Sequence, residues 1–317
     1  MLMELLEIVL AFVSLIIVLV LVFGFILSRS VIHLDRQPVP KNPADYGMTY
    51  QRVDLTAEDN VKTKAWFIPG NSNKLIVMTH VGGLTKYGST VSFKSFSKLF
   101  NKEIEFLKVA RHLHNEGYGV LMFDFRNHGE SEASPNGGKA AVGVEEYKDV
   151  VAAMNFIGSN DAIKNMSIGF VSFCMGANST IIAMSKQPQI FKNVKCMVAV
   201  QPISMAVFIR TYAKKRFTTV GGASLFPVLQ FFVNLQSKHR LQDMSPRDYV
   251  KDIKVPTLYV QVRKDPWTEL SDIEGFYDAT PTEKDFLWLE DLTHRFEGYQ
   301  YFGDNPQRML DWLKKWL

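Results

Sequence analysis

Cys174 stands where a buried strand is predicted to turn directly into a helix. Residues 168–177 read IGFVSFCMGA, an apolar run followed by a residue with small neighbours two positions away on each side, Ser172 and Gly176. Such a turn forces its middle residue into a strained backbone conformation and needs small neighbours for clearance. It also directs that side chain at a helix N-terminus, where partial positive charge stabilises an anion. The pattern indicates a nucleophilic cysteine; the alternative interpretation is a small buried apolar residue.

This segment resembles the nucleophile elbow of the α/β-hydrolase superfamily, G-x-S-x-G. Ser172 replaces the first glycine, and Cys174 stands where serine is usual, as it does in dienelactone hydrolases and polyhydroxyalkanoate synthases. The resemblance extends over roughly residues 48–317. It implies an α/β-hydrolase fold, with an eight-stranded, mostly parallel sheet, helices on both faces and a small cap insertion.

A second segment, residues 117–131, reads GYGVLMFDFRNHGES and looks like the superfamily's sequence after its fourth strand, G-Y-x-V-x-x-x-D-x-R-G-x-G-x-S. In relatives this stretch is structural. The resemblance therefore implies that Asp124 and Arg126 tie the loop beside the elbow. It makes His128 a poor catalytic candidate.

The oxyanion hole is expected in the loop that follows residues 74–79. That loop reads His80-Val81-Gly82-Gly83, where relatives carry His-Gly-x and the N–H of x stabilises the oxyanion. By position x is Gly82, although Val81 replaces the usual glycine. The second donor would be the N–H of Met175, the residue after the nucleophile. The alternative is an ordinary glycine loop.

The remaining catalytic groups follow from the superfamily's chain order of nucleophile, acid and histidine. Asp265 follows the seventh predicted strand, in the sequence RKDPW, and His294 follows the eighth, in DLTHRF. The resemblance thus implies a Cys174–Asp265–His294 triad. In this mechanism His294 takes the thiol proton, Asp265 orients the imidazole, and the thiolate attacks an acyl carbon to form a thioester.

The expected reaction is hydrolysis of a carboxylic ester or thioester, because a thiolate is itself a good leaving group and unactivated amides suit such a site poorly. The membrane anchor predicted below favours a small-molecule or lipid-like acyl substrate. Two other functions stay open. One is an acyltransferase in which an alcohol, amine or thiol outcompetes water at the same intermediate. The other is an inactive α/β-hydrolase domain that acts as a binding module. No cofactor and no metal is expected.

Alternating strand and helix patterns position these groups. Short apolar or alternating runs predict strands at 50–55 and 64–68, as an antiparallel pair, and at 74–79, 119–125, 166–173, 195–200, 257–262 and 286–289. Helical patterns occur at 104–114, 144–157, 175–185, 270–277 and 305–316. Strands alternating with helices predict a mostly parallel sheet covered on both faces, whose ligands bind at the carboxyl ends of the strands.

An uncharged apolar run of twenty residues, IVLAFVSLIIVLVLVFGFIL, extends from Ile8 to Leu27. At about 1.5 Å per residue this helix spans about 30 Å, the thickness of a bilayer's hydrocarbon core. A retained single-pass membrane helix is therefore predicted; a cleaved signal peptide and a buried core helix are the alternatives. The basic residues Arg29, Arg36 and Lys41 follow the run, and no lysine or arginine precedes it. This distribution favours a cytoplasmic domain over the opposite topology.

The predicted organisation is a membrane anchor at 1–29, a proline-containing linker at 30–47 and a hydrolase domain at 48–317, with a cap insertion at 205–250. The apolar stretch 225–233 is too short to span a bilayer. It can line an acyl pocket, pack on the sheet or touch the membrane surface. The basic side chains that precede it face either solvent or anionic groups: Arg210, Lys214, Lys215 and Arg216.

Composition excludes several other classes of protein. The 317-residue chain is 47% hydrophobic and 21% charged, which is ordinary for a folded protein. A formal net charge of +4 without a long basic run gives no reason to expect nucleic acid. The chain has two cysteines, Cys174 and Cys196, so a disulfide-stapled scaffold is not expected. The oligomeric state is left open.

Overall fold

Eight strands form one sheet in the computed structural model, which describes residues 2–90 and 103–317, the side chains of 217–222 and 224 excepted. The strand order is β1-β2-β6-β3-β7-β8-β9-β10; the β1–β2 and β2–β6 pairs are antiparallel and the others are parallel. The strands are β1 (Gln51–Thr56), β2 (Lys62–Ile68), β3 (Lys74–Thr79), β6 (Gly119–Phe123), β7 (Ser167–Phe173), β8 (Val194–Val200), β9 (Thr257–Val262) and β10 (Lys284–Leu289). This is the α/β-hydrolase fold that the sequence predicts.

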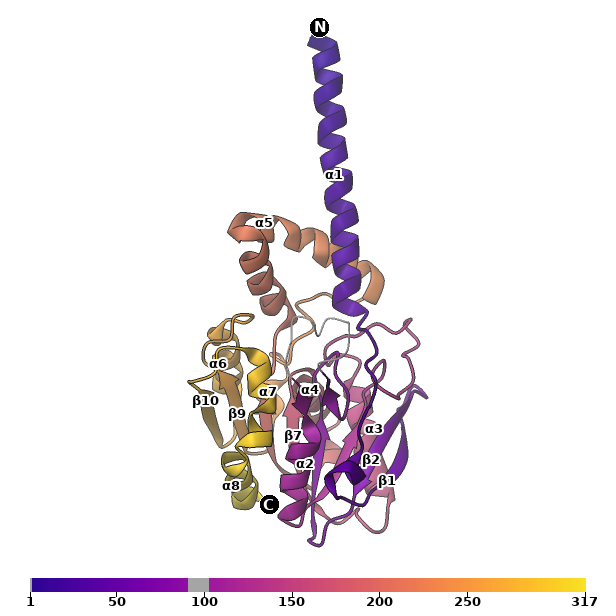
Figure 1. The fold of residues 1–317 in the computed structure, drawn as a ribbon, viewed down its shortest axis with the longest axis vertical. Helices are drawn as coiled ribbons and strands as arrows, with labels where there is room; N and C mark the ends of the chain where they lie inside the picture. Colours follow the sequence, from indigo (N-terminus) through magenta and orange to yellow (C-terminus); the bar gives the residue numbers. More distant parts are fainter. Residues whose placement is uncertain (1, 91–102) are drawn as a thin grey trace.

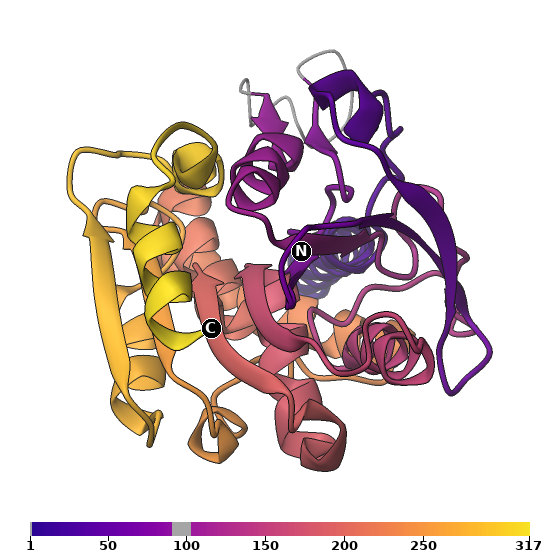
Figure 2. The ribbon, with the colours of Figure 1, turned by 90° about the horizontal axis from the view of Figure 1, so that it is seen from below.

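Helices cover both faces of the sheet (Figure 2), with α2 packed beside α7 and α3 beside α4. The helices of the sheet domain are α2 (Phe106–Asn115), α3 (Tyr147–Ser159), α4 (Met175–Lys186), α6 (Leu270–Ala279), α7 (Arg295–Asp304) and α8 (Gln307–Trp316). Shorter elements are η1 (Pro43–Tyr46), η3 (Pro188–Phe191), η4 (Val250–Asp252) and the two-stranded pair β4 (Gly88–Ser89) and β5 (Ile104–Glu105). The start of the helix expected at 104 is thus a short strand, and α7 was not predicted.

Helix α1 (Leu2–Ile32) projects from the sheet domain (Figure 1) and continues past the predicted end of the anchor at residue 29. Its length and composition identify it as a candidate membrane span or signal sequence. The end of α1 and the segment after it are fixed to the domain: the Ala140 N–H donates to Ile32 O at 2.8 Å, and Gln37 Nε2 donates to Gly83 O at 2.6 Å. The predicted linker therefore holds the end of α1 against the sheet domain.

The predicted cap insertion consists mainly of helix α5 (Met205–Ser237). It rises from the sheet domain, bends, and its second half lies beside α1 (Figure 1). Pro227 lies inside the helix, where a missing N–H and the ring's bulk favour a kink. The two elements that the sequence assigns to anchor and cap thus contact each other directly.

Candidate active site

Cys174 occupies the strained turn that the sequence predicts. It links β7 to α4 with φ 50° and ψ −112°, in the left-handed half of backbone space that a β-carbon disfavours. The small neighbour Gly176 is required, because a β-carbon there would lie 2.5 Å from Thr79 Oγ1 and 2.8 Å from His80 O. Cys174 is only 6% exposed, yet it lines a cavity.

Two buried histidines hold the loop opposite the elbow. His80 Nδ1 donates to Val81 O at 2.8 Å while its Nε2 accepts from the Phe125 N–H at 3.0 Å. His128 Nε2 accepts from the Gly83 N–H at 2.9 Å. Burial lowers the pKa of both rings, so both are neutral at physiological pH. His128 therefore fixes the glycine loop, consistent with its low rank as a catalytic candidate.

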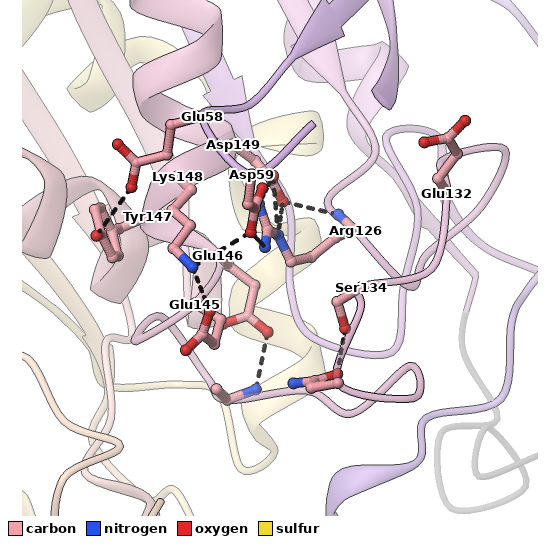
Figure 3. A network of polar contacts seen from close by, with 12 residues as sticks. Glu58, Asp59, Arg126, Glu132, Ser134, Glu145, Glu146, Tyr147, Lys148 and Asp149 are labelled. Carbon is pink, nitrogen blue, oxygen red and sulfur yellow. Dashed lines mark hydrogen bonds and ion pairs between the residues drawn. The ribbon is translucent and has the colours of Figure 1, made fainter. Parts of the chain in front are cut away.

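Arg126 fixes the loop that carries His128, as the resemblance implies. Its guanidinium binds Asp149 on α3 at 2.8 Å and Asp59 at 2.6 Å, and its own N–H bonds the Asp149 carboxylate (Figure 3). Such bidentate hydrogen bonds are the strongest geometry for an arginine–carboxylate pair. The network spans the hairpin after β1, the loop after β6 and the start of α3, and it acts on the site by positioning, not by contact.

Gly82 and Met175, the predicted oxyanion donors, lie together beside the elbow. A β-carbon on Gly82 would sit 3.2 Å from Met175 Sδ, and both residues line the cavity that contains Cys174. Met175 begins α4, and the first N–H groups of a helix have no acceptor within it. The arrangement suits donation to an oxygen beside the sulfur, and the two assignments stay predictions.

Asp265 lies at the end of β9, where the prediction puts it, but its cationic partner is Arg295. Arg295 Nη1 donates to Asp265 Oδ2 at 2.6 Å, and Gln261 Nε2 donates to the same oxygen at 3.0 Å. Arg295 Nη2 lies 3.8 Å from Cys174 Sγ, and Nε donates to the Tyr299 hydroxyl at 2.6 Å. Arg295 thus bridges the acid and the sulfur from a position only 1% exposed.

The Arg295 guanidinium stays positively charged across the physiological pH range. Burial alone lowers the pKa of Arg295, but Tyr299, Asp265 and Cys174 around it raise that pKa above its ordinary value. Burial also raises the pKa of Tyr299 far above its usual range, so the phenol is neutral. The carboxylate in direct contact with this guanidinium is Asp265, at 2.6 Å.

His294, the predicted base, lies after β10 at the start of α7. It caps the N-terminus of α7, its Nδ1 accepting from the Phe296 N–H at 3.4 Å, and its ring packs edge-on against Trp267 at 5.1 Å between centroids. The carboxylate of Asp265 is bound by Arg295 in place of the His294 imidazole. The side chain that joins Asp265 to the sulfur in this structure is therefore Arg295, which cannot act as a general base. The catalytic roles of Cys174, Asp265 and His294 stay predictions.

A cavity of about 350 Å³ opens at Cys174, within the range of small-molecule pockets. Its walls come from the end of α1 and the segment after it, the glycine loop, the elbow, the start of α5 and the start of α7. Its apolar lining includes Leu34, Leu84, Met205, Phe208, Ile209 and Phe296. Among the described residues, no group of three or more His, Cys, Asp or Glu side chains is arranged to hold a metal ion.

The fold and the elbow together define an α/β hydrolase. Residues 103–317 match the model of the prolyl oligopeptidase family, and the chain belongs to that family. Members of this family normally use serine as the nucleophile, so Cys174 is a departure. Membership supports a hydrolase of the esterase or peptidase type, the coarser part of the predicted function.

Proteins similar to this chain include one curated relative and many solved structures, among them an esterase and an α/β hydrolase. The uncharacterized protein YqkD of Bacillus subtilis (strain 168) is 25% identical over 182 residues, 56% of each chain. The solved esterase Pf2001 of Pyrococcus furiosus is 24% identical with a TM-score of 0.65, over 90% of this chain and 98% of that one. The α/β hydrolase GrgF of Penicillium sp. sh18 is 15% identical with a TM-score of 0.57, over 84% and 99%. At these identities the two structures show the fold.

Proposed function

We propose that this protein is a membrane-anchored hydrolase that cleaves carboxylic esters or thioesters with Cys174 as its nucleophile. The observation that carries the proposal is the sulfur on the strained turn, with Arg295 Nη2 at 3.8 Å, at the edge of an apolar cavity. A neighbouring arginine and a helix N-terminus are two of the environments that stabilise a thiolate. Nucleophilic character then arises from a fixed positive charge in place of proton transfer to histidine.

The reaction forms and breaks one bond in each half. The Cys174 thiol first loses its proton to water, and the thiolate then bonds to the acyl carbon while the N–H groups of Gly82 and Met175 stabilise the oxyanion. Collapse breaks the acyl C–O or C–S bond and expels an alkoxide or thiolate, which takes a proton from water. Water then adds to the thioester and releases the acid and the thiol. With Arg295 at the position expected of the base, we expect deacylation to be the slow step and the acyl-enzyme to accumulate.

The anchoring part of the proposal rests on α1. Its run from Ile8 to Leu27 matches the thickness of a bilayer core, and Arg29, Arg36 and Lys41 on its C-terminal side favour a cytoplasmic domain. The domain boundaries at 29, 47 and 205–250 belong to the same proposal. Alkali-resistant retention of the full-length protein in the membrane fraction tests the anchor, whereas a cleaved signal peptide would shorten the mature chain.

Covalent trapping tests the nucleophile. The full-length protein in detergent is mixed with para-nitrophenyl butyrate, and the butyryl adduct is mapped by peptide mass spectrometry. We expect a nitrophenol burst of one equivalent and an adduct on Cys174, both lost in Cys174→Ala. Cys196→Ala is the matched control, because burial raises the pKa of Cys196 to about 12 and its thiol lies inside β8.

Two further variants separate the ion-pair arrangement from the predicted triad. His294→Asn retains a helix-capping side chain and should acylate as the wild type does, whereas Arg295→Met should acylate slowly. The opposite result, loss in His294→Asn alone, would restore the histidine as the base and refute the role given to Arg295.

A binding module is the second candidate, and the observation that favours it is that Arg295, which cannot act as a base, contacts both Asp265 and Cys174. In that case an acyl compound occupies the cavity without forming a bond to Cys174. Saturable binding of the ester with no burst and no adduct would establish this function and overturn the first. An acyl-enzyme that reacts faster with added thiol or alcohol than with water would instead identify an acyltransferase.

A further inference from the structure

The cavity at Cys174 is continuous with the end of helix α1. Arg29, Val31 and Leu34, at and just beyond the last turn of that helix, form one wall. Cys174 lies on the wall that belongs to the sheet domain. A ligand filling this space would contact both the nucleophile and the part of the chain that leaves the proposed membrane span.

Helix α5 joins this cavity to the side of α1. Its first residues, among them Phe208 and Ile209, line the cavity. Its second half packs closely on α1: a β-carbon on Gly24 would lie 2.5 Å from Val228 Cγ1, and the rings of Phe25 and Phe232 meet at 5.6 Å. Figure 1 shows this half of α5 lying beside the lower part of α1. Small residues allow such close helix approach within membranes.

The depth of this contact follows from the length of the apolar run. Gly24 lies three residues before Leu27, the last residue of the run, and so about 4.5 Å inside it at about 1.5 Å per residue. Gln236 Nε2 donates to Ser28 Oγ at 2.6 Å, just outside the run. The second half of α5 therefore lies at the boundary between headgroups and acyl chains, where interfacial helices reside about 5–10 Å deep.

The face of α5 turned away from the protein carries two large apolar side chains. Phe231 and Leu235 are 60% and 65% exposed, and their spacing of four residues puts them on one side of the helix. The opposite side, with Phe226, Leu229 and Val233, is buried. Exposed large side chains that adjoin a membrane span face the bilayer, so the occupant of this surface is lipid.

We propose that the cavity at Cys174 is filled from the bilayer, and that the substrate is an acyl ester or thioester carried by a membrane lipid. The chain enters beside α5 and the end of α1 and reaches the sulfur without crossing water. Arg29, at the same wall, faces the polar part of the lipid. This inference rests on the proposed function for its chemistry, whereas lipid entry itself has an independent readout.

Photocrosslinking provides that readout. The full-length protein is reconstituted into phosphatidylcholine vesicles that contain a phosphatidylcholine with a diazirine on its acyl chain, irradiated, and digested for mass spectrometry. We expect crosslinks to α1, to the outer face of α5 and to the cavity wall at residues 203–209. Crosslinks confined to α1 would overturn the proposal.

Variants of the exposed face test the route. Phe231→Ser/Leu235→Ser should lower the crosslink yield at the cavity wall at least tenfold, measured against crosslinks to α1. Asn234→Ser, exposed on the same turn, is the matched control and should stay within twofold. An unchanged cavity yield in the double variant would refute entry along α5.

A soluble ester separates this inference from the proposed function. Acylation of Cys174 by para-nitrophenyl butyrate should be within twofold of wild type in Phe231→Ser/Leu235→Ser, because that ester does not need the membrane. If the double variant has lost this reaction through misfolding, the same two measurements, acylation by the soluble ester and crosslinking at the cavity wall, are made on Leu235→Ser alone. Cavity crosslinks in a wild-type protein that never acylates would refute the nucleophile and leave lipid entry standing.

Discussion

The ion pair between Asp265 and Arg295 is the feature most open to a quantitative test. The two side chains are 0% and 1% exposed and are joined at 2.6 Å, so removing one strands a buried charge. Breaking such a pair costs about 3–5 kcal/mol. Asp265 retains hydrogen bonds from Gln261 and from the Trp267 N–H, so the expected loss in Arg295→Met is about 3 kcal/mol, at the low end of that range. For a domain of this size a loss of about 3 kcal/mol lowers the unfolding midpoint by about 5 °C.

A double-mutant cycle isolates the pair from the packing of the two residues. Arg295→Met and Asp265→Leu are each expected to destabilise the protein, whereas the double variant replaces both charges by apolar side chains and should lose far less than the sum. A coupling free energy of about 2 kcal/mol or more is expected between residues in direct contact. Urea unfolding in a fixed detergent measures it, and additive losses would refute the ion pair.

The same variants report on the chemistry. A hydrogen bond to a charged group is worth about 1.5–3 kcal/mol, so Arg295→Met should slow acylation of Cys174 by about ten- to one-hundred-and-fifty-fold. Arg295→Lys keeps the positive charge but lacks the planar guanidinium that reaches Asp265 and the sulfur together. Compared with Arg295→Met, it should restore more of the free energy of unfolding than of the acylation rate. An acylation rate unaffected in Arg295→Met would refute the role of the guanidinium.

Three further predictions concern the framework. Gly176→Ala should destabilise the protein by about 1–3 kcal/mol or more in urea unfolding, because its β-carbon would lie 2.8 Å from His80 O; a stable variant would contradict the close packing. Burial lowers the pKa of His80 and His128, so both stay neutral in the folded protein, whereas in the unfolded chain they take up protons below pH about 6.5. The free energy of unfolding should therefore decrease as the pH falls below that value, by up to about 1.4 kcal/mol per pH unit for each histidine. His128→Gln should reduce this slope, and an unchanged slope would assign it elsewhere. Lys86→Met leaves the Asp124 carboxylate buried without its 2.6 Å partner and should cost about 3–5 kcal/mol; a loss below about 1 kcal/mol would show that backbone donors to Asp124 suffice.

The sheet and the elbow were predictable because their signals are local. Continuous apolar runs mark strands buried on both faces, as in β3 and β7, and alternation marks the antiparallel strand β1. The elbow was predictable for the same reason, since Ser172 and Gly176 lie within two residues of Cys174. The residues that satisfy the steric requirements of such a turn are close together in the sequence.

The contact between α5 and α1 was not predictable, because its partners lie some two hundred residues apart. From the sequence, residues 225–233 can line an acyl pocket, pack on the sheet or touch the membrane surface. None of these three alternatives predicts a contact with α1. A weak signal exists in Gly24, the one glycine of the apolar run from Ile8 to Leu27. A small residue in a membrane helix indicates a close neighbour without identifying it.

The adjacent residues His294 and Arg295 show how one residue of uncertainty changes the chemistry of a site. Successive residues of a helix point about 100° apart, so the side chain that reaches Asp265 depends on the residue at which α7 begins. His294 takes the cap, with Glu297 accepting the His294 N–H at 3.1 Å, and Arg295 becomes the first residue of the helix. Helix ends are not fixed by sequence to one residue, and two adjacent polar residues therefore leave the partner of Asp265 undetermined. The sequence could predict that a cation from this loop meets Asp265, but whether it is a titratable base or a permanent charge is decided by the start of α7.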